Sequence, residues 1–236
     1  MRETFTVEAE GVGRPDYTRE NSTAGASVSI TNPLPVAISP AAKTVLTILD
    51  EAVIDALTTT ALADCTPVDL TRGPITLALT VKARYDAAAT QGIRVHVRTS
   101  PTNSATGTHT GLVHLTIMTD AVAHFIANEL VGLTILNVTD GSSGVVIANT
   151  ETTVTVAALA GGTLNRWMTG DAYTITGADY DTIDWDVWNP TFAAGAVLRQ
   201  TEDYDTSPMY TKVLVENLDP ARTVTDILVI AEVGVL

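Results

Sequence analysis

The stretch from Ile75 to Tyr85 constrains the fold more than any other part of this sequence. Its apolar residues stand at every second position: Ile75, Leu77, Leu79, Val81, Ala83 and Tyr85. The intervening positions include Thr76, Thr80, Lys82 and Arg84. A period of two is typical of a β-strand with one buried face, and helical spacing does not produce it. The stretch therefore predicts a half-buried antiparallel strand.

A second run, from Ile93 to Thr99, repeats this alternation after a turn marked by Gly92. Its outward positions hold Arg94, His96 and Arg98. We expect this run and the first to pair as neighbours in one sheet. The last run, 226–235, carries apolar residues at both kinds of position, which predicts a strand covered on both sides.

Between Gly111 and Gly177 the chain changes to short runs rich in Val, Ile and Thr that glycines separate. These runs span residues 133–138, 144–148, 152–157 and 172–176. Asp140-Gly141 and Gly161-Gly162 supply the positive φ angles that tight hairpins require. A further strand is expected at 210–217. Strands separated by turns every ~8 to 12 residues predict an all-β antiparallel sandwich or barrel.

Two segments are open to more than one interpretation. Residues 1–33 mix Gly, Pro, Asn, Ser and charged residues, so they are either an extended N-terminal arm or a floppy terminus. Residues 41–63 partly fit helical spacing, with Ser39-Pro40 as a possible start. The same residues contain Thr-Val-Leu-Thr-Ile-Leu and three consecutive threonines, which favour strands. We expect strands there.

The charge of the chain limits its partners. A formal net charge of −14 and a pI near 4.4 would repel phosphate backbones, so no nucleic acid is expected as a partner. No run reaches the ~18 apolar residues that span a bilayer, and the first residues lack the apolar core of an export signal. Cys65 is the single cysteine and cannot form an internal disulfide. We expect a folded protein stabilised by packing, with no membrane partner.

Four segments together resemble a small β-module of tailed-bacteriophage virion proteins. They are the hairpin Asn137-Val-Thr-Asp-Gly-Ser-Ser-Gly144, Asn149–Val156, Gly161–Trp167 and Gly170–Tyr173. The flanking segments 81–86, 93–100 and 210–219 are similar to the jelly-roll-like sandwich segments of phage structural proteins. The resemblance covers roughly two thirds of the chain. It is carried by turns and strands and not by catalytic residues, so it indicates a structural setting.

This resemblance implies a division of the chain into three parts. Residues 1–33 would form the extended N-terminal arm, 34–110 and 178–236 a jelly-roll-like antiparallel β-sandwich, and 111–177 an inserted small β-barrel or β-hairpin module. The inserted module would display a Thr-rich surface for contact. Its turns would fix its own strand register from local contacts.

The side chains most often used in catalysis show no catalytic spacing in this sequence. The histidines His96, His109, His114 and His124 lack a metal-binding motif, and we interpret them as scattered surface residues. Cys65 has no CxxC partner and is expected to be a buried small hydrophobe. Ser142 and Ser143 are expected to form a turn, with no nucleophile elbow around them. We predict no catalytic residue, no cofactor-binding residue and no cofactor.

An acidic stretch from Gly177 to Pro190 is the one candidate for metal binding. It holds Asp179, Asp181, Asp184 and Asp186, and Glu202, Asp203 and Asp205 could lie nearby in the fold. Carboxylate oxygens suit Ca²⁺, but the spacing departs from the EF-hand loop. A solvated acidic strand edge that discourages edge pairing is the preferred interpretation. No metal site is therefore assigned.

Trp185 and Trp188 belong to the same stretch, near Tyr180. Such rings either stack on sugars or pack in a core, where each buries ~150–250 Å². Because aromatic residues make up 5 % of the chain, core packing is favoured. The sequence leaves the exposure of both tryptophans open.

These observations together predict a non-enzymatic structural component of a bacteriophage virion. It would be a head decoration or a tail-associated protein, assembled in the host bacterial cytoplasm. Its partners would be copies of itself, as a homo-oligomer, and other virion proteins. The alternative is a carbohydrate-binding or host-adhesion module whose exposed tryptophans contact host glycans.

Overall fold

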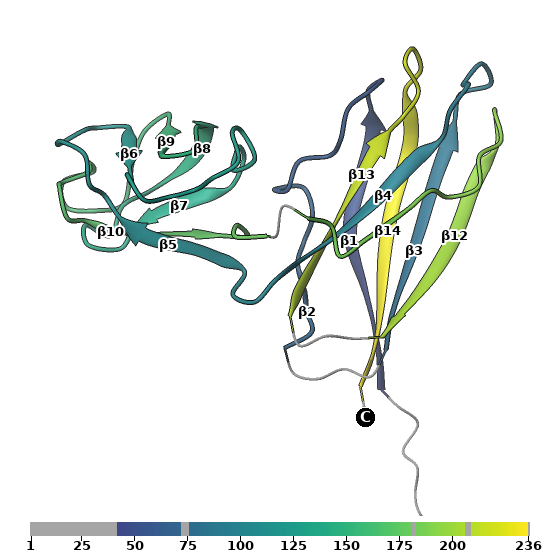
Figure 1. The fold of residues 1–236 in the computed structure, drawn as a ribbon, viewed down its shortest axis with the longest axis horizontal. Helices are drawn as coiled ribbons and strands as arrows, with labels where there is room; N and C mark the ends of the chain where they lie inside the picture. The colour runs from purple at the N-terminus through teal and green to yellow at the C-terminus, as the bar shows by residue number, and fades with distance from the viewer. Residues whose placement is uncertain (1–41, 72–75, 181–182, 206–208, 236) are drawn as a thin grey trace, which may run out of the picture. The chain divides into compact units, whose positions relative to one another are not determined.

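The computed structural model describes residues 42–71, 76–180, 183–205 and 209–235. The predicted arm, 1–33, lies outside these residues. The described chain forms strands without helices, and all paired strands are antiparallel (Figure 1). The predicted all-β class is therefore confirmed. No helix that could span a lipid bilayer occurs in the described part of the chain.

Two four-stranded sheets form the sandwich. The first has the order β1-β14-β3-β12, with β1 at Ala42–Ile54, β14 at Val224–Val235, β3 at Thr76–Tyr85 and β12 at Val197–Asp205. The second has the order β11-β4-β13-β2, with β11 at Asp186–Trp188, β4 at Ile93–Ser100, β13 at Tyr210–Asn217 and β2 at Val68–Asp69. Their facing sides share one apolar core.

The strongest alternation in the sequence forms β3, as predicted. Leu77, Leu79, Val81 and Ala83 are fully buried, and the residues between them are partly exposed. The expectation that β3 pairs with β4 is wrong. β3 pairs with β14 and β12, and β4 pairs with β13 and β11. Both apolar faces belong to the same core, but the two strands reach it from opposite sheets.

Residues 42–54 form the single strand β1, which agrees with the expected preference for strand over helix. Residues 55–63 form turns and an isolated bridge from Thr59 to Glu216, so the expectation of strands is wrong for this part. A register shift between Thr47 and Leu49 lets Ile48 and Leu49 both be buried. The prediction that β14 is covered on both sides is wrong. Leu228 and Ile230 lie on its outer face and remain partly exposed, because no further sheet packs on that side among the described residues.

The third sheet has six strands in the order β5-β10-β7-β8-β9-β6 and curls like half of a barrel (Figure 1). Its strands are β5 Ser104–Thr108, β10 Ala172–Thr176, β7 Thr134–Asn137, β8 Ser143–Asn149, β9 Thr153–Val156 and β6 Ile117–Thr119. A separate core that includes the fully buried Trp167 and Met118 fills its inner side. The division of the chain at residues 111 and 177 stays a prediction.

The turn between β7 and β8 contains the expected glycine. Gly141 has φ 80° and donates a hydrogen bond from its N–H to the carbonyl of Asn137 at 2.8 Å. Asp140 does more than form this turn. Its carboxylate accepts backbone N–H bonds from Thr163, Leu164 and Asn165 at 2.7–3.1 Å, which lowers its pKa. One acidic side chain thus ties the hairpin to a second loop.

Candidate functional site

The six-stranded sheet carries an apolar patch on its outer side. Leu136, Val138, Val145 and Ile147 point outward from β7, its C-terminal end and β8, between the buried Ile135, Asn137 and Val146. Their exposed fractions are 39 %, 51 %, 55 % and 55 %. We call these four residues the β7–β8 patch. Alternation brings them to the same face, so they form a group and not scattered surface residues.

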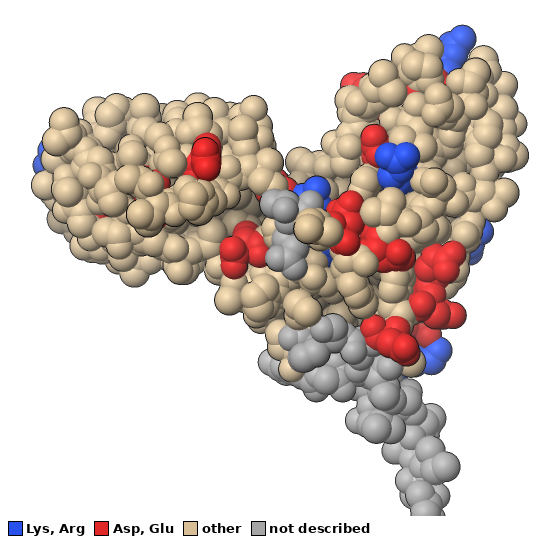
Figure 2. All heavy atoms as spheres, viewed as in Figure 1, with Lys and Arg blue, Asp and Glu red and all other residues tan. Residues whose placement is uncertain are grey.

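Charged residues are scarce around this patch. Between residues 104 and 177 the single Lys or Arg is Arg166. Figure 2 shows that the surface of this sheet and its loops is largely uncharged on the face in view, whereas acidic side chains gather over the sandwich. Low charge beside exposed apolar side chains is typical of the centre of a protein–protein interface.

A loop of residues 112–115 adds further exposed apolar side chains. Leu112, Val113 and Leu115 are exposed by 89 %, 50 % and 66 %. The backbone of this loop is nevertheless fixed. His109 Nε2 lies 3.0 Å from the carbonyl oxygen of Leu112, and His114 Nδ1 accepts backbone N–H bonds from residues 116 and 117. The loop therefore presents apolar side chains from a hydrogen-bonded backbone.

The interpretation of the histidines as surface residues is wrong for His109, which is 1 % exposed. Its Nδ1 accepts the N–H of Thr119 at 2.8 Å, and its Nε2 lies 3.0 Å from the carbonyl oxygen of Leu112. His109 thereby connects β6 to the 112–115 loop. The flanking sequence gave no periodic pattern from which this burial could have been predicted.

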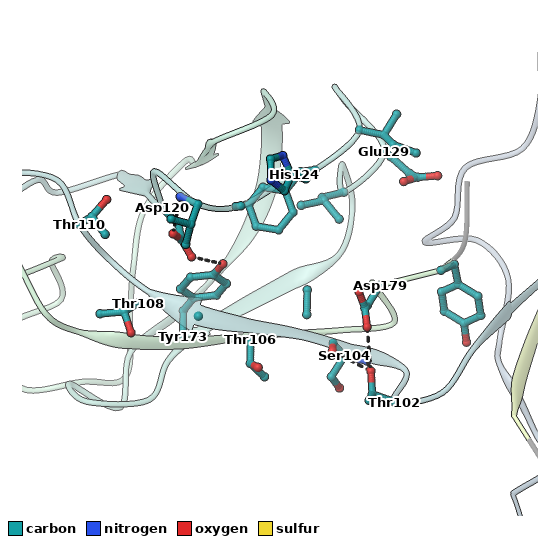
Figure 3. Close-up of a pocket in the computed structure, with 18 residues that line it drawn as sticks. Thr102, Ser104, Thr106, Thr108, Thr110, Asp120, His124, Glu129, Tyr173 and Asp179 are labelled. Carbon is teal, nitrogen blue, oxygen red and sulfur yellow. Dashed lines mark hydrogen bonds between the residues drawn. The ribbon is translucent and has the colours of Figure 1, made fainter. Parts of the chain in front are cut away.

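A groove of about 570 Å³ runs along β5 (Figure 3). One wall is β5 itself, with Ser104, Thr106 and Thr108, and the facing wall is the 120–130 segment. Further lining comes from Tyr173, Asp179 and Tyr180. Hydroxyl, carboxylate and aromatic groups therefore share this groove.

The floor of the groove is built around a pair of buried side chains. Tyr173 donates its hydroxyl hydrogen to Asp120 Oδ2 at 2.9 Å, and the two residues are 2 % and 4 % exposed. Burial is the largest cause that raises the pKa of Tyr173, and the hydrogen bond to Asp120 is the second. Gly107 passes directly beneath them, since a Cβ there would lie 2.6 Å from the Tyr173 hydroxyl and also meet Asp120. The close packing explains why β5 carries glycine at this position.

The aspartates of the acidic stretch do not converge. Asp179 accepts a hydrogen bond from Thr102, Asp184 bonds His96 and Arg98, and Asp186 accepts the Tyr204 hydroxyl. Asp181 lies outside the described residues. Glu202, Asp203 and Asp205 lie on β12. Within the described ranges, no group of three or more His, Cys, Asp or Glu side chains is placed to hold a metal ion.

Asp184 belongs to a charged cluster on the outer face of β4. It lies 2.8 Å from His96 Nδ1 and accepts a 3.0 Å bond from Arg98 Nε, while Arg98 also pairs with Glu129. Burial raises the pKa of Asp184, but the bonds from His96 and Arg98 outweigh it and lower that pKa. Burial raises the pKa of Glu129, against the opposing effect of Arg98. The cluster holds segments far apart in sequence together.

The two tryptophans of the acidic stretch differ in their surroundings. Trp188 packs against the sandwich core. Trp185 is 37 % exposed, and its ring centroid lies 5.3 Å from that of Tyr204. Trp188 thus takes the expected core role, whereas Trp185 keeps an accessible face.

Sequence reasoning missed Lys212, a lysine on β13 that is 2 % exposed. It lies in a cluster with Tyr180, whose ring centroid is 5.3 Å from Nζ. Cys65 is buried as expected, and burial raises its pKa to about 11. No signal in the sequence around residue 212 predicted a buried charge.

Comparison with known proteins identifies no relative. No protein-family model, no curated protein sequence and no solved structure matches this chain.

Proposed function

We propose that this chain is a non-enzymatic structural component of a bacteriophage virion that acts through protein–protein assembly. The supporting observation is the β7–β8 patch, in which four large apolar side chains lie on one face of a weakly charged sheet. Grouped apolar side chains on a surface mark interaction sites more often than scattered ones do. The assignment to a virion rests on the resemblance of the hairpin and strand segments.

The mechanism of such an assembly follows from the geometry. Each outward residue of β7 and β8 is held by a buried neighbour, so the patch has a fixed shape before contact. Binding then costs little ordering entropy, and the burial of apolar area favours association. The exposed 112–115 loop would extend this surface.

Sedimentation velocity over a concentration series tests the proposal. We expect the full chain to associate, and the double substitution Val145→Thr/Ile147→Thr to weaken association by at least about tenfold. Val197→Thr is a matched control, because Val197 is an exposed valine of similar exposure, 51 %, on β12 of the sandwich. A chain that stays monomeric at high concentration and does not bind phage particles would contradict the proposal.

A carbohydrate-binding module is the second candidate function, and the accessible ring of Trp185 favours it. Tyr204 beside it supplies a second ring. Aromatic faces of this kind stack on sugar rings. Quenching of tryptophan fluorescence by a polysaccharide, lost in Trp185→Leu, would support this function, and silence across a glycan panel would exclude it.

A further inference from the structure

The strand β5 leaves one edge of the six-stranded sheet unpaired among the described residues. It bonds β10 on one side and has no strand on the other. Two backbone hydrogen bonds at the ends of β5 show which of its residues direct their N–H and carbonyl groups toward β10. His109 donates its N–H to the carbonyl of Asp171 at 2.7 Å, and Asn103 accepts the N–H of Gly177 at 2.8 Å. Residues 103, 105, 107 and 109 therefore bond toward β10, since this alternation holds along an antiparallel ladder.

The even-numbered residues of β5 must then direct their backbone groups toward the open edge. Ser104 is engaged with the side chain of Thr102. For Thr106 and Thr108 the described residues supply no partner for either the N–H or the carbonyl, and both residues are exposed. Thr106 and Thr108, the two outward-facing residues, thus present free backbone N–H and carbonyl groups, which is the arrangement that an added strand requires.

The groove of about 570 Å³ lies along this edge. Its facing wall makes backbone bonds to the turn after β8 and to the end of β8, from Phe125 N–H to Glu151 O and from Asn128 N–H to Asn149 O, both 3.0 Å. These bonds hold the wall against β8 and the turn after it. The groove lies between this wall and the free edge of β5 (Figure 3).

Among the described residues, the long edge strands β12 and β1 carry features that oppose pairing, and the edge strand β5 does not. β12 has charged residues along its length, namely Arg199, Glu202, Asp203 and Asp205. β1 has the register shift at Thr47 as well as charged residues. β5 reads Ser-Ala-Thr-Gly-Thr, with no charge, no proline and no bulge. Edges without such features are templates for strand addition.

The charge of the residues that line the groove indicates which kind of peptide segment would bind there. The acids Asp120, Glu129 and Asp179 line the groove together with His124, which faces Glu151, and no Lys or Arg lines it among the described residues. Asp120 bonds Tyr173, and Glu129 pairs with Arg98. Asp179 is exposed and accepts a bond from the Thr102 hydroxyl at 3.0 Å, which leaves carboxylate capacity for a further donor.

We propose that the free edge of β5 binds an extended peptide segment of a partner protein, with a basic side chain directed to Asp179. The segment adds as a further strand, and its backbone bonds Thr106 and Thr108. This site is separate from the β7–β8 patch, so the two can be tested independently.

The test is fluorescence anisotropy of the full chain with a labelled, end-blocked peptide, Lys-Thr-Val-Thr-Val-Thr-Lys. We expect saturable binding that Thr106→Pro weakens by about tenfold or more, because proline removes the outward N–H and leaves the bonds to β10 intact. Thr106→Val keeps the N–H and should stay within about twofold of the parent chain. Asp179→Asn, which tolerates the φ of 66° there, should weaken binding by a few fold.

Two further arms keep the result decisive if Thr106→Pro does not fold. Thr108→Pro should act in the same way, and a peptide methylated at alternate backbone nitrogens should not bind the unmodified chain. Absence of saturable binding would overturn the proposal. Equal losses of peptide affinity in Thr106→Val and Thr106→Pro would overturn it too, because they would show that the Thr106 side chain, and not its backbone N–H, binds the peptide. Dimerisation without peptide that Thr106→Pro abolishes would overturn it as well, because the occupant would then be a second copy.

Discussion

Lys212 donates a 2.7 Å hydrogen bond from Nζ to the backbone carbonyl of Leu62, although the lysine is almost fully buried. A second bond, of 3.0 Å, reaches the carbonyl of Gly177. Burial lowers the pKa of Lys212, since the charged form is disfavoured away from water. Three segments distant in the sequence meet at this one ammonium group.

Replacement of Lys212 tests whether this contact stabilises the fold. Lys212→Ala removes a buried aliphatic chain and leaves two carbonyl groups without their donor, so we expect a loss of about 2–4 kcal/mol in the free energy of unfolding. Lys82→Ala on the partly exposed face of β3 is the control and should change it by less than about 0.5 kcal/mol. Urea denaturation measures both. Equal losses in the two variants would show that the bonds of Lys212 have no special role.

Cys65 should make stability fall in alkaline solution. Burial raises its pKa from 9.0 to about 11, so the folded state keeps its proton when the unfolded state has lost it. The resulting stabilisation is complete below pH 9 and is lost as the pH rises through about 11. This stabilisation amounts to about 2–3 kcal/mol, because a difference of one pKa unit corresponds to about 1.4 kcal/mol.

Cys65→Ala should flatten this alkaline decrease. The measurement is the free energy of urea unfolding at several values between pH 8 and pH 11, compared with the unmodified chain. The difference between the two chains is the quantity of interest, because Tyr85, Tyr173 and Tyr204 have pKa values that are raised independently of Cys65. Cys65 contributes to the raised pKa of Tyr180, so the effect on Tyr180 belongs to the difference. A difference that does not change with pH would contradict the assignment.

Asp219 should control stability in acid. Its carboxylate accepts backbone N–H bonds from Thr90, Gln91, Ala221 and Arg222, at 2.5–3.1 Å. The bond from Thr90 and then that from Ala221 contribute most to lowering its pKa. Because the folded pKa is lowered, this stabilisation is present above the usual aspartate pKa of about 3.9 and is lost as the pH falls below it.

Asp219→Asn should lower the melting temperature by several degrees at pH 7 and should have less effect near pH 2. Differential scanning calorimetry at both values measures this, and Asp205→Asn, at an exposed position of β12, is the control. An Asp219→Asn penalty that is as large in acid as at neutral pH would rule out the carboxylate as its source.

Gly107→Ala tests the packing beneath the groove. The added methyl group would meet the Tyr173 hydroxyl and Asp120, so we expect a loss of about 1–3 kcal/mol. Thr108→Ala next to it is the control and should be nearly neutral, since Thr108 is exposed. Chemical denaturation of both variants decides between a required glycine and a tolerant position.

The sequence predicted which face of a strand is buried better than it predicted which strands pair. The alternation of Leu77, Leu79 and Val81 indicated correctly which side of β3 is buried. It could not indicate that β3 and β4 lie in different sheets, because a strand from either sheet presents the same apolar face to a shared core. Pairing depends on the path of the connection at residues 86–92, which the alternation does not encode.

Candidate sites were harder to predict than strands. Asp179, Asp184 and Asp186 are close in sequence, yet their partners are Thr102, His96 with Arg98, and Tyr204, which lie on three different segments. Lys212 could not be identified from sequence because its acceptors are backbone carbonyls, which every residue possesses. The free edge of β5 depends on sheet order, a property of the whole fold.

The central claim is that the outward apolar side chains of the six-stranded sheet become buried in an assembly. Hydroxyl-radical footprinting of the full chain, from dilute solution to the assembled state, tests this directly. We predict that labelling of Val138, Val145 and Ile147 falls several-fold on assembly while labelling of Val197 does not change. Unchanged labelling of the β7–β8 patch in the assembled state would contradict the account.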